Sequence, residues 1–280
     1  MIWLNGDMRP AENAVSANDR GLLLGEAVFE TMLVENRHIA FWDAHLARLM
    51  AACAAFGFDC RYSDAALANA AQQLMDAQDD GSDQELAQNR LALRLTVTGG
   101  HGGRGLVPST PSESNWLMHL SPAPAAPQGL MLHIGDVLRL AGSPLTAHKT
   151  GNYLDNIIAR RAALAVGADE AVMLNQFGRV ACTAAGTIYL QRGPLLLTPP
   201  LSEGALPGII RGQVLQHGGL AGLTCQEALI EPDMLRTADA LFVSNSLIGV
   251  VPAHMQGGSD ITEGQKKQGA ALCTALSKFA

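Results

Sequence analysis

The sequence lacks the cysteine spacing that indicates disulfides or a structural metal site. Its five cysteines are an odd number, and none of them forms a CxxC pair: they are Cys53, Cys60, Cys182, Cys225 and Cys273. A disulfide framework or a structural zinc site is therefore not expected. Reduced thiols are typical of cytoplasmic proteins, so we expect a cytoplasmic location.

Long apolar runs and clusters of basic residues are also missing. No apolar run approaches the roughly 18 residues that a membrane helix needs, and segments such as "GPLLLTPPL" are interrupted by proline. The first residues, "MIWLNGDMRPAEN", have none of the regions of a signal peptide. The formal net charge is −7, and no arginine-rich stripe is present. We therefore expect neither a membrane nor a nucleic acid as partner.

What the sequence does contain is enough apolar material for a large core. It has 280 residues, of which 48% are hydrophobic and 16% charged. This length fits one large α/β unit or two lobes. The Pro- and Ala-rich segment "SPAPAAPQG" at 121–129 has no periodicity and is the best candidate for a linker. We therefore expect an N-terminal α/β domain at 1–120 and a C-terminal domain at 130–280.

Hydrophobic periodicity predicts strands and helices in both halves. In the first half it predicts strands at about 27–34 and 38–41, a helix from an N-cap at Asp43 to a C-cap at Gly57, a helix at about 63–79, and strands in "NRLALRLTVTGG" and "NWLMHLSP". In the second half it predicts a strand in "LMLHIGDVL", a helix at 152–166, strands in "AVMLN", "VAC", "TIYLQR", "LLLTPP" and "ALFVSNSLIGVVPAH", and a helix opened by "LPGIIRG".

Three short motifs contain residues that could carry chemistry. Lys149 lies just ahead of the helix predicted at 152–166, and a lysine that attacks an aldehyde must be held in a dry pocket. The turn Pro207-Gly208 delivers Ile209 and Ile210 to a helix N-terminus, which favours phosphate. Arg48, on a helix, could bind phosphate in a bidentate manner. Taken singly, each motif has a simpler reading: a solvated lysine with Asn152 as N-cap, an ordinary helix start, and a surface arginine.

Together and in order, the motifs resemble the class IV aminotransferase family. The resemblance begins at "LNGDMRPAENAVSANDRGLLLGEAVFET". It continues through "HLARLMAAC", "HKTGNYLDNIIARRAALAVGADEAVMLNQFGRVAC", "LPGIIRGQVL" and "LFVSNSLIGVVP". The resemblance implies the two-domain α+β architecture of fold type IV, like D-amino acid aminotransferase, with pyridoxal 5′-phosphate between the domains. "GGRGL" and "FVSNSLIGVVP" look most like the 4-amino-4-deoxychorismate lyase branch.

The resemblance also implies roles for single residues. Lys149 matches the lysine that bonds covalently to the cofactor and moves the proton at the substrate carbon. The cofactor-binding positions are Arg48 at the phosphate, Ile209 and Ile210 through their backbone amides, Ser246 and Leu247 at a second phosphate-side turn, and Tyr153 at the phenolic oxygen. Arg104 looks like a binder of the substrate carboxylate, in a loop that the family places near a partner subunit. The resemblance therefore implies a homodimer acting on an amino-acid-like small molecule.

One position departs from the family pattern. Where the family has a glutamate facing the pyridine nitrogen of the cofactor, the stretch "GRVACTAAGT" has Cys182, and the family's later asparagine is Thr187. One interpretation is a protein that has lost its activity and keeps Cys182 as a small buried hydrophobe. The other is that Cys182 is a neutral hydrogen-bonding partner of the ring nitrogen, because a thiol with a reference pKa of about 8.5 carries no fixed charge at neutral pH.

The second interpretation favours a reaction that supplies its own driving force. A ring without a facing carboxylate is a weaker electron sink, and loss of pyruvate from 4-amino-4-deoxychorismate is helped by formation of an aromatic ring. The leading expectation is therefore a lyase of folate biosynthesis that makes 4-aminobenzoate and pyruvate. The alternatives are a transaminase acting on a branched-chain or D-amino acid with a 2-oxo acid acceptor, and a non-catalytic cofactor-binding homologue.

Overall fold

The computed structural model describes residues 1–12, 14–78, 90–102, 105–107 and 113–279. These residues form two compact units. Unit 1 comprises Met1–Pro124 and His148–Asn152, and unit 2 comprises Ala125–Ala147 and Tyr153–Ala280. The short segment that contains Lys149, expected in the C-terminal domain, thus packs with unit 1. The boundaries expected from the sequence, with a linker at 121–129, remain a prediction.

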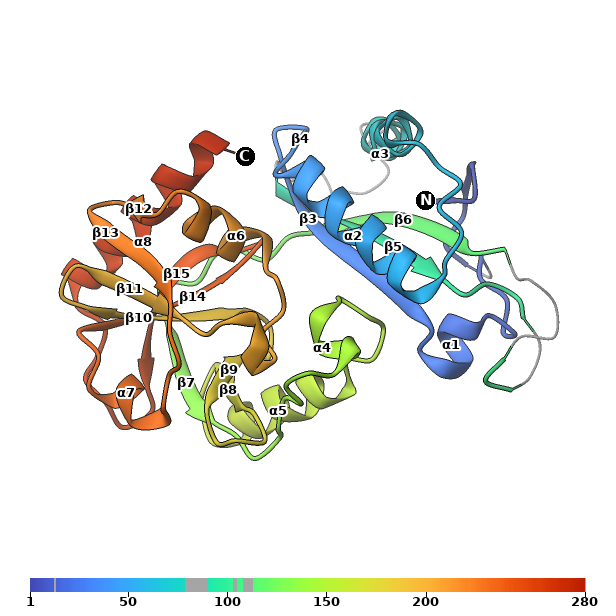
Figure 1. Ribbon diagram of the computed structural model, residues 1–280. Coiled ribbons are helices and arrows are strands. Elements are labelled where there is room, and N and C mark those ends of the chain that lie inside the picture. Colours follow the sequence, from blue (N-terminus) through green and yellow to red (C-terminus); the bar gives the residue numbers. More distant parts are fainter. Residues whose placement is uncertain (13, 79–89, 103–104, 108–112, 280) are drawn as a thin grey trace. The chain divides into compact units, whose positions relative to one another are not determined.

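Unit 1 is built on a six-stranded antiparallel sheet with the strand order β2-β1-β6-β5-β3-β4. Its helices α2 and α3 pack against this sheet, as the blue and teal elements in Figure 1 show. The elements are β1 (Ile2–Leu4), β2 (Asp7–Arg9), α1 (Arg20–Leu24), β3 (Ala27–Glu35), β4 (His38–Ile39), α2 (Trp42–Phe56), α3 (Asp64–Gln78), β5 (Arg90–Thr98) and β6 (Asn115–Pro122).

The periodicity of the first half produces the helices and strands that it predicts, with shifts at their ends. Leu46, Leu49 and Cys53 recur at helical spacing and are buried on one face of α2. Gly57 ends this helix in the left-handed conformation, as expected for a C-cap glycine. The N-cap, however, is Phe41 rather than Asp43. Asp43 lies in the first turn instead, where its charge favours the helix dipole.

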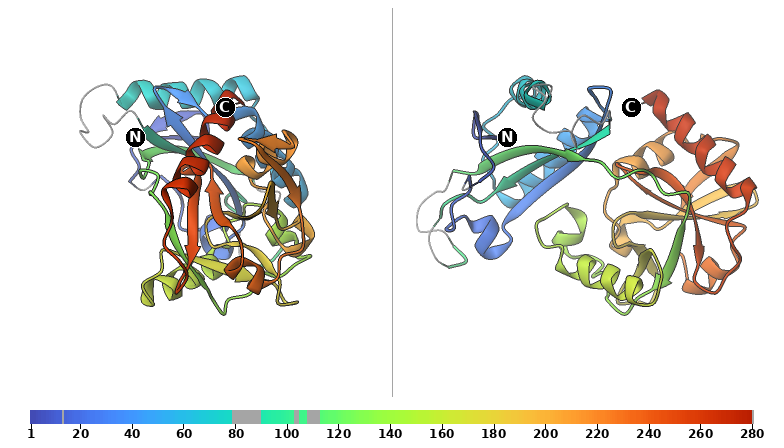
Figure 2. Two further views of the ribbon diagram at one scale, coloured as in Figure 1. Left: turned by 90° about the vertical axis from the view of Figure 1, so that its left-hand side faces the viewer. Right: turned by 180° about the vertical axis from the view of Figure 1, so that it is seen from behind.

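Unit 2 contains a nine-stranded mixed sheet with the order β12-β13-β11-β10-β14-β15-β7-β8-β9. Helix α8 packs along β15, and Figure 2 shows α8 in red beside these strands. The elements are β7 (Leu130–Ile134), α4 (Pro144–Ala147), α5 (Leu154–Ala165), β8 (Glu170–Leu174), β9 (Val180–Thr183), β10 (Thr187–Arg192), β11 (Leu195–Thr198), the 3₁₀ turn η1 (Leu201–Glu203), α6 (Ile209–Gln216), β12 (Gly219–Leu220), β13 (Leu223–Glu227), α7 (Pro232–Arg236), β14 (Ala240–Asn245), β15 (Gly249–Met255), α8 (Glu263–Leu276) and the 3₁₀ turn η2 (Ser277–Phe279).

Among the differences between unit 2 and expectation, two concern the helices α5 and α8. Helix α5 begins at Leu154 with Tyr153 as N-cap, so Asn152 is not the N-cap. The amide of Asn152 instead donates to the carbonyl oxygen of Gly25 at 3.1 Å. Helix α8 was not expected, although its start carries a capping box in which Thr262 and Gln265 bond each other's backbone N–H groups.

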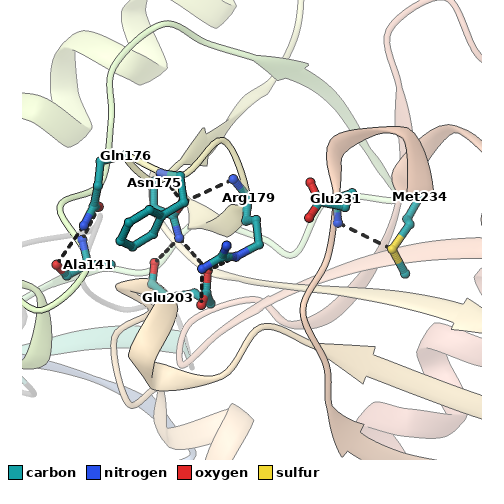
Figure 3. A network of polar contacts seen from close by, with 8 residues as sticks. Ala141, Asn175, Gln176, Arg179, Glu203, Glu231 and Met234 are labelled. Atoms are coloured by element: carbon teal, nitrogen blue, oxygen red, sulfur yellow. Dashed lines mark hydrogen bonds and ion pairs between the residues drawn. The ribbon is translucent and has the colours of Figure 1, made fainter.

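A polar cluster around Glu203 fixes two turns of unit 2 (Figure 3). Glu203 is buried and accepts hydrogen bonds from the Nδ2 of Asn175 at 2.7 Å and from the Nε and NH2 of Arg179 at 2.6 and 2.9 Å. Asn175 also accepts from the backbone N–H of Phe177 and Arg179. The turn before β9 is thereby tied to the loop that leads to α6.

We expect Glu203→Gln to lower the melting temperature by a few degrees at pH 7, because the amide cannot replace a carboxylate that accepts charge-assisted hydrogen bonds. The hydrogen bonds from Arg179 lower the pKa of Glu203, against the effect of burial, with Asn175 adding to the lowering. The stabilisation is therefore complete above the unfolded pKa of about 4.3 and is lost as the pH falls through the folded value. The difference between wild type and variant should shrink below about pH 4.

Thermal unfolding followed by circular dichroism from pH 3 to 8 checks this. The control is Glu263→Gln, which removes an exposed ion pair with Lys266 and should change little. A Glu203→Gln deficit that is the same at pH 3 and pH 7 would contradict the argument.

Candidate functional site

Lys149 is held in unit 1 by backbone pairing with the start of β3. The N–H of Phe29 donates to the carbonyl oxygen of Lys149 at 2.9 Å, and the N–H of Gly151 donates to Ala27 at 2.7 Å. Thr150 and Val28 form an isolated β-bridge between these two bonds. A Cβ at Gly151 would lie 3.2 Å from the Cβ of Ala27, so the close approach favours glycine there. The lysine thus sits on a fixed backbone.

The side chain of Lys149 lies on an aromatic surface. Its Nζ is 4.3 Å from the ring centroid of Phe29, a buried residue. The guanidinium carbon of Arg94, on the neighbouring strand β5, is 3.7 Å from the same centroid. The half-buried amine thus lies against an apolar ring that also contacts a second cation.

Next to Phe29, the carboxylate of Glu30 holds two side chains of α2 in place. It accepts from the Nε and NH2 of Arg48 at 2.7 and 2.6 Å, and it bonds the Nδ1 of His45 at 2.7 Å. Glu30 and His45 are fully buried, and the Arg48 side chain is 12% exposed. A guanidinium oriented in this way is a suitable group for a phosphate.

The charges of this cluster are coupled. Burial raises the pKa of Glu30, but the hydrogen bonds from His45 and Arg48 outweigh it and the pKa is lowered. Burial lowers the pKa of His45, and the charges of Arg48 and Lys149 lower it further, against the opposite effect of Glu30. Within the described part of the chain, the Nε2 of His45 is buried without a hydrogen-bond partner. His45 is therefore a neutral ring close to both cations.

The structure thus brings Lys149 and Arg48 together, through residues that sequence reasoning missed. Phe29, Glu30 and His45 were not expected to belong to the site. A signal for His45 was available, because His45 and Arg48 are three residues apart on one helix and residues at this spacing share a face. No local signal marks Glu30, since it lies in a strand whose neighbours are apolar.

In unit 2, the expected phosphate-binding turn is the start of α6. Ile209 and Ile210 are its first residues, both buried, and Gly208 is the N-cap. Glycine has no side chain to accept from the first N–H groups, which therefore suit an anion. A Cβ on Gly208 would lie 2.9 Å from the Oγ1 of Thr187, so this hydroxyl lies beside the helix start.

A second candidate loop of unit 2 is the turn between β14 and β15. Thr187 on β10 pairs with Ser244 on β14, and the hydroxyls of Ser244 and Tyr189 are 2.9 Å apart. Ser246 and Leu247 form the turn between β14 and β15, where the Oδ1 of Asn245 accepts from the N–H of Leu247 at 2.9 Å. The hydroxyl of Thr187, on a strand that pairs with the one carrying Ser244, thus borders the start of α6.

Three further residues were expected at the site: Cys182, Tyr153 and Arg104. Cys182 is buried on β9, opposite Met173 of β8. Tyr153 is half-buried at the start of α5. Arg104 lies outside the described residues, so its proposed contact with a substrate carboxylate stays a prediction.

Comparison with known proteins identifies the family. The model of "Amino-transferase class IV" matches residues 27–255. The chain belongs to the class IV aminotransferase family. It is 27% identical to D-alanine aminotransferase of Bacillus licheniformis over 94% of this chain and 90% of that protein. It is 26% identical to the branched-chain-amino-acid aminotransferase of Salmonella typhimurium, over 94% and 87%.

The fold agrees with this family. The crystal structure of 4-amino-4-deoxychorismate lyase from Pseudomonas aeruginosa superimposes with a TM-score of 0.81 and 27% identity, over 99% of both chains. The expected α+β architecture of fold type IV, with its two sheets, is confirmed. None of the described helices is both long and apolar enough to cross a bilayer.

We expect Glu30→Gln to destabilise the protein by about 3 kcal/mol, because it leaves the largely buried guanidinium of Arg48 without its carboxylate. The matched control on the same strand is Glu35→Gln, whose exposed pair with Arg90 should contribute less than about 1 kcal/mol. Urea unfolding at pH 7 measures both. Equal effects of the two substitutions would show that the Glu30 cluster does not stabilise unit 1.

Proposed function

We propose that this enzyme is a pyridoxal 5′-phosphate-dependent lyase that converts 4-amino-4-deoxychorismate to 4-aminobenzoate and pyruvate. The observation that carries the cofactor assignment is the position of Lys149, whose amine lies on the Phe29 ring in the same unit as the carboxylate-oriented Arg48. The family uses this cofactor. When bound, it supplies an electron sink for the bond being broken.

The residues fit the cofactor in chemical type. Lys149 supplies the amine for the covalent bond, and we assign Arg48 to the phosphate. The N–H groups of Ile209 and Ile210, with Ser246 and Leu247 at the neighbouring turn, are further phosphate ligands in this proposal. Tyr153 is assigned to the phenolic oxygen, Cys182 to the ring nitrogen and Arg104 to the substrate carboxylate.

In the reaction, the free amine of Lys149 takes the proton from the substrate carbon that carries the amino group. The neighbouring C–O bond breaks, the six-membered ring of the substrate becomes aromatic, and the side chain leaves as the enol form of pyruvate. Its methylene carbon then takes up a proton, which gives pyruvate and balances the proton removed by Lys149. The ring of Phe29 positions this amine, with the Nζ 4.3 Å from the ring centroid. Because the thiol of Cys182 is neutral, the pyridine ring of the cofactor would be a weaker electron sink. The formation of an aromatic ring in the product offsets this weakness.

A transaminase acting on a branched-chain or D-amino acid, with a 2-oxo acid acceptor, is the second candidate. It is supported by the relatives of both kinds, whose identities to this chain of 27% and 26% are close to the 27% of the lyase. The third candidate, a non-catalytic cofactor-binding homologue, is disfavoured by the fixed position of Lys149. The proposed setting is the cytoplasm, in folate biosynthesis.

We expect pyruvate and 4-aminobenzoate to form from 4-amino-4-deoxychorismate without any 2-oxo acid present. Lys149→Ala should lower turnover by several orders of magnitude, because no other base replaces the lysine. Arg94→Gln, which changes the second cation on the Phe29 ring, is the matched control and should keep the covalent cofactor. Product that appears only when a 2-oxo acid acceptor is added would favour the transaminase.

We also propose a homodimer, supported by an exposed apolar surface on unit 1. This leucine patch consists of Leu22, Leu23, Leu24, Leu106 and Val107, and three of them are exposed by 70% or more. Arg20, itself buried, holds the two segments together by donating to the carbonyl oxygens of Gly105 at 2.8 Å and Leu106 at 3.0 Å. A patch that is apolar and also held rigidly suits an interface between copies of the chain.

We expect light scattering at micromolar concentration to give the dimer mass for the wild type. Leu22→Glu combined with Leu106→Glu should give monomers, because it places charges in the apolar interface. Leu229→Glu, at an exposed leucine of unit 2, should leave the mass unchanged. A fully active wild-type monomer would contradict the proposed dimer.

A further inference from the structure

Arg139 of unit 2 is a half-buried cation, and within the described part of the chain its hydrogen-bond acceptors are all neutral. Its Nε donates to the carbonyl oxygen of Gly204 at 3.2 Å, its NH2 to Thr146 at 3.4 Å and its NH1 to the Oδ1 of Asn156 at 3.5 Å. Among the residues that the structure describes, no carboxylate oxygen lies within 4.0 Å of this guanidinium. Its charge is therefore not neutralised locally.

The side chain of Asn156 connects this cation to the hairpin that carries Cys182. The Nδ2 of Asn156 donates to the carbonyl oxygen of Ala184 at 2.7 Å and lies 3.9 Å from the sulfur of Met173. Met173 is paired with Cys182 across β8 and β9. Arg139 is thus one buried side chain away from the strand of Cys182.

The electrostatics agree with this geometry. Burial raises the pKa of Cys182 to about 11, and the charge of Arg139 acts in the opposite direction. At neutral pH, Cys182 is therefore a neutral thiol in the field of a cation. A neutral thiol can donate a hydrogen bond but brings no negative charge to its surroundings.

The other charged group near Cys182 is Glu170, which has partners of its own. It is buried, accepts from the N–H of Ala171 at 2.9 Å, and lies 3.7 Å from the NH1 of Arg160. Burial raises its pKa, and its effect on Cys182 is smaller than that of Arg139. Arg139 therefore outweighs Glu170 in its effect on the pKa of the Cys182 thiol.

We propose that Arg139 keeps the ring nitrogen of the bound cofactor unprotonated, and that this nitrogen accepts a hydrogen bond from the thiol of Cys182. The proposal rests on the function above, which assigns Cys182 to that nitrogen. A nearby cation disfavours a protonated, positively charged ring. Arg139 is a positioning residue that acts through its charge. It makes the cofactor ring a weak electron sink. The enzyme is thereby restricted to substrates whose products are stabilised, for example by becoming aromatic.

The proximity of the two side chains can be tested in the cofactor-free protein. Cys182→Glu places a carboxylate near Arg139, whereas Cys182→Gln has the same shape without the charge. We expect Cys182→Glu to melt at least about 3 °C above Cys182→Gln in the wild-type background. In an Arg139→Gln background the order should reverse, because the buried carboxylate then has no partner. If the difference in melting temperature between Cys182→Glu and Cys182→Gln were the same in both backgrounds, the proposed effect of Arg139 on position 182 would be overturned.

The protonation state can be read in the loaded enzyme with pyridoxal 5′-phosphate labelled with ¹⁵N at the ring nitrogen. We expect the ¹⁵N shift of the wild type at pH 7 to be that of an unprotonated ring. Cys182→Ser keeps the hydrogen-bond donor and Arg139→Lys keeps the positive charge, so both variants should also show the shift of an unprotonated ring. Cys182→Glu should move it to the protonated position, and Arg139→Gln should raise the midpoint of its pH titration by about one unit.

The outcomes separate this inference from the proposed function. A wild-type enzyme that binds the cofactor covalently but shows a protonated ring nitrogen would overturn the role of Arg139 and leave the function intact. A chain that never forms the covalent bond would overturn the function, and with it the proposal. A shift unchanged by both Cys182→Glu and Arg139→Gln would show that these residues do not face the ring.

Discussion

The site of unit 1 depends on the backbone pairing between the segment His148–Gly151 and the first residues of β3. Two hydrogen bonds, from Phe29 to Lys149 and from Gly151 to Ala27, fix the lysine backbone against a strand in the interior of the sheet. A lysine on an independent loop would lose the aromatic surface of Phe29 whenever that loop moved. The same strand carries Glu30, so one strand positions both the amine and, through its carboxylate, the guanidinium of Arg48.

Much of the secondary structure could be predicted from sequence because its signals are local. The apolar spacing in α2, the alternation in β5 and the left-handed glycine at Gly57 depend on neighbouring residues only. The first turn of α2 was misjudged because an acidic residue can stabilise a helix either as its cap or from within its first turn. Helix α8 was missed since its exposed face is polar and its capping box is the main marker of its start.

The candidate site was predictable only in part, for a physical reason. Lys149, Arg48, Ile209 and Ile210 lie in motifs that can be read along the chain. The contacts of Glu30 with His45 and Arg48 join residues 15 and 18 positions apart, on a strand and a helix. The hydroxyl of Thr187 beside Gly208 and the guanidinium of Arg139 near Cys182 likewise arise from tertiary packing. No sequence spacing contains such information.

The central claim is that Lys149 is the residue to which the cofactor is bonded. The most direct test is mass spectrometry of peptides after the protein is incubated with pyridoxal 5′-phosphate and reduced with sodium borohydride. We expect one phosphopyridoxyl group per chain, on the peptide that contains Lys149. The same label on Lys266, Lys267 or Lys278 with Lys149 unmodified, or no label at all, would contradict it.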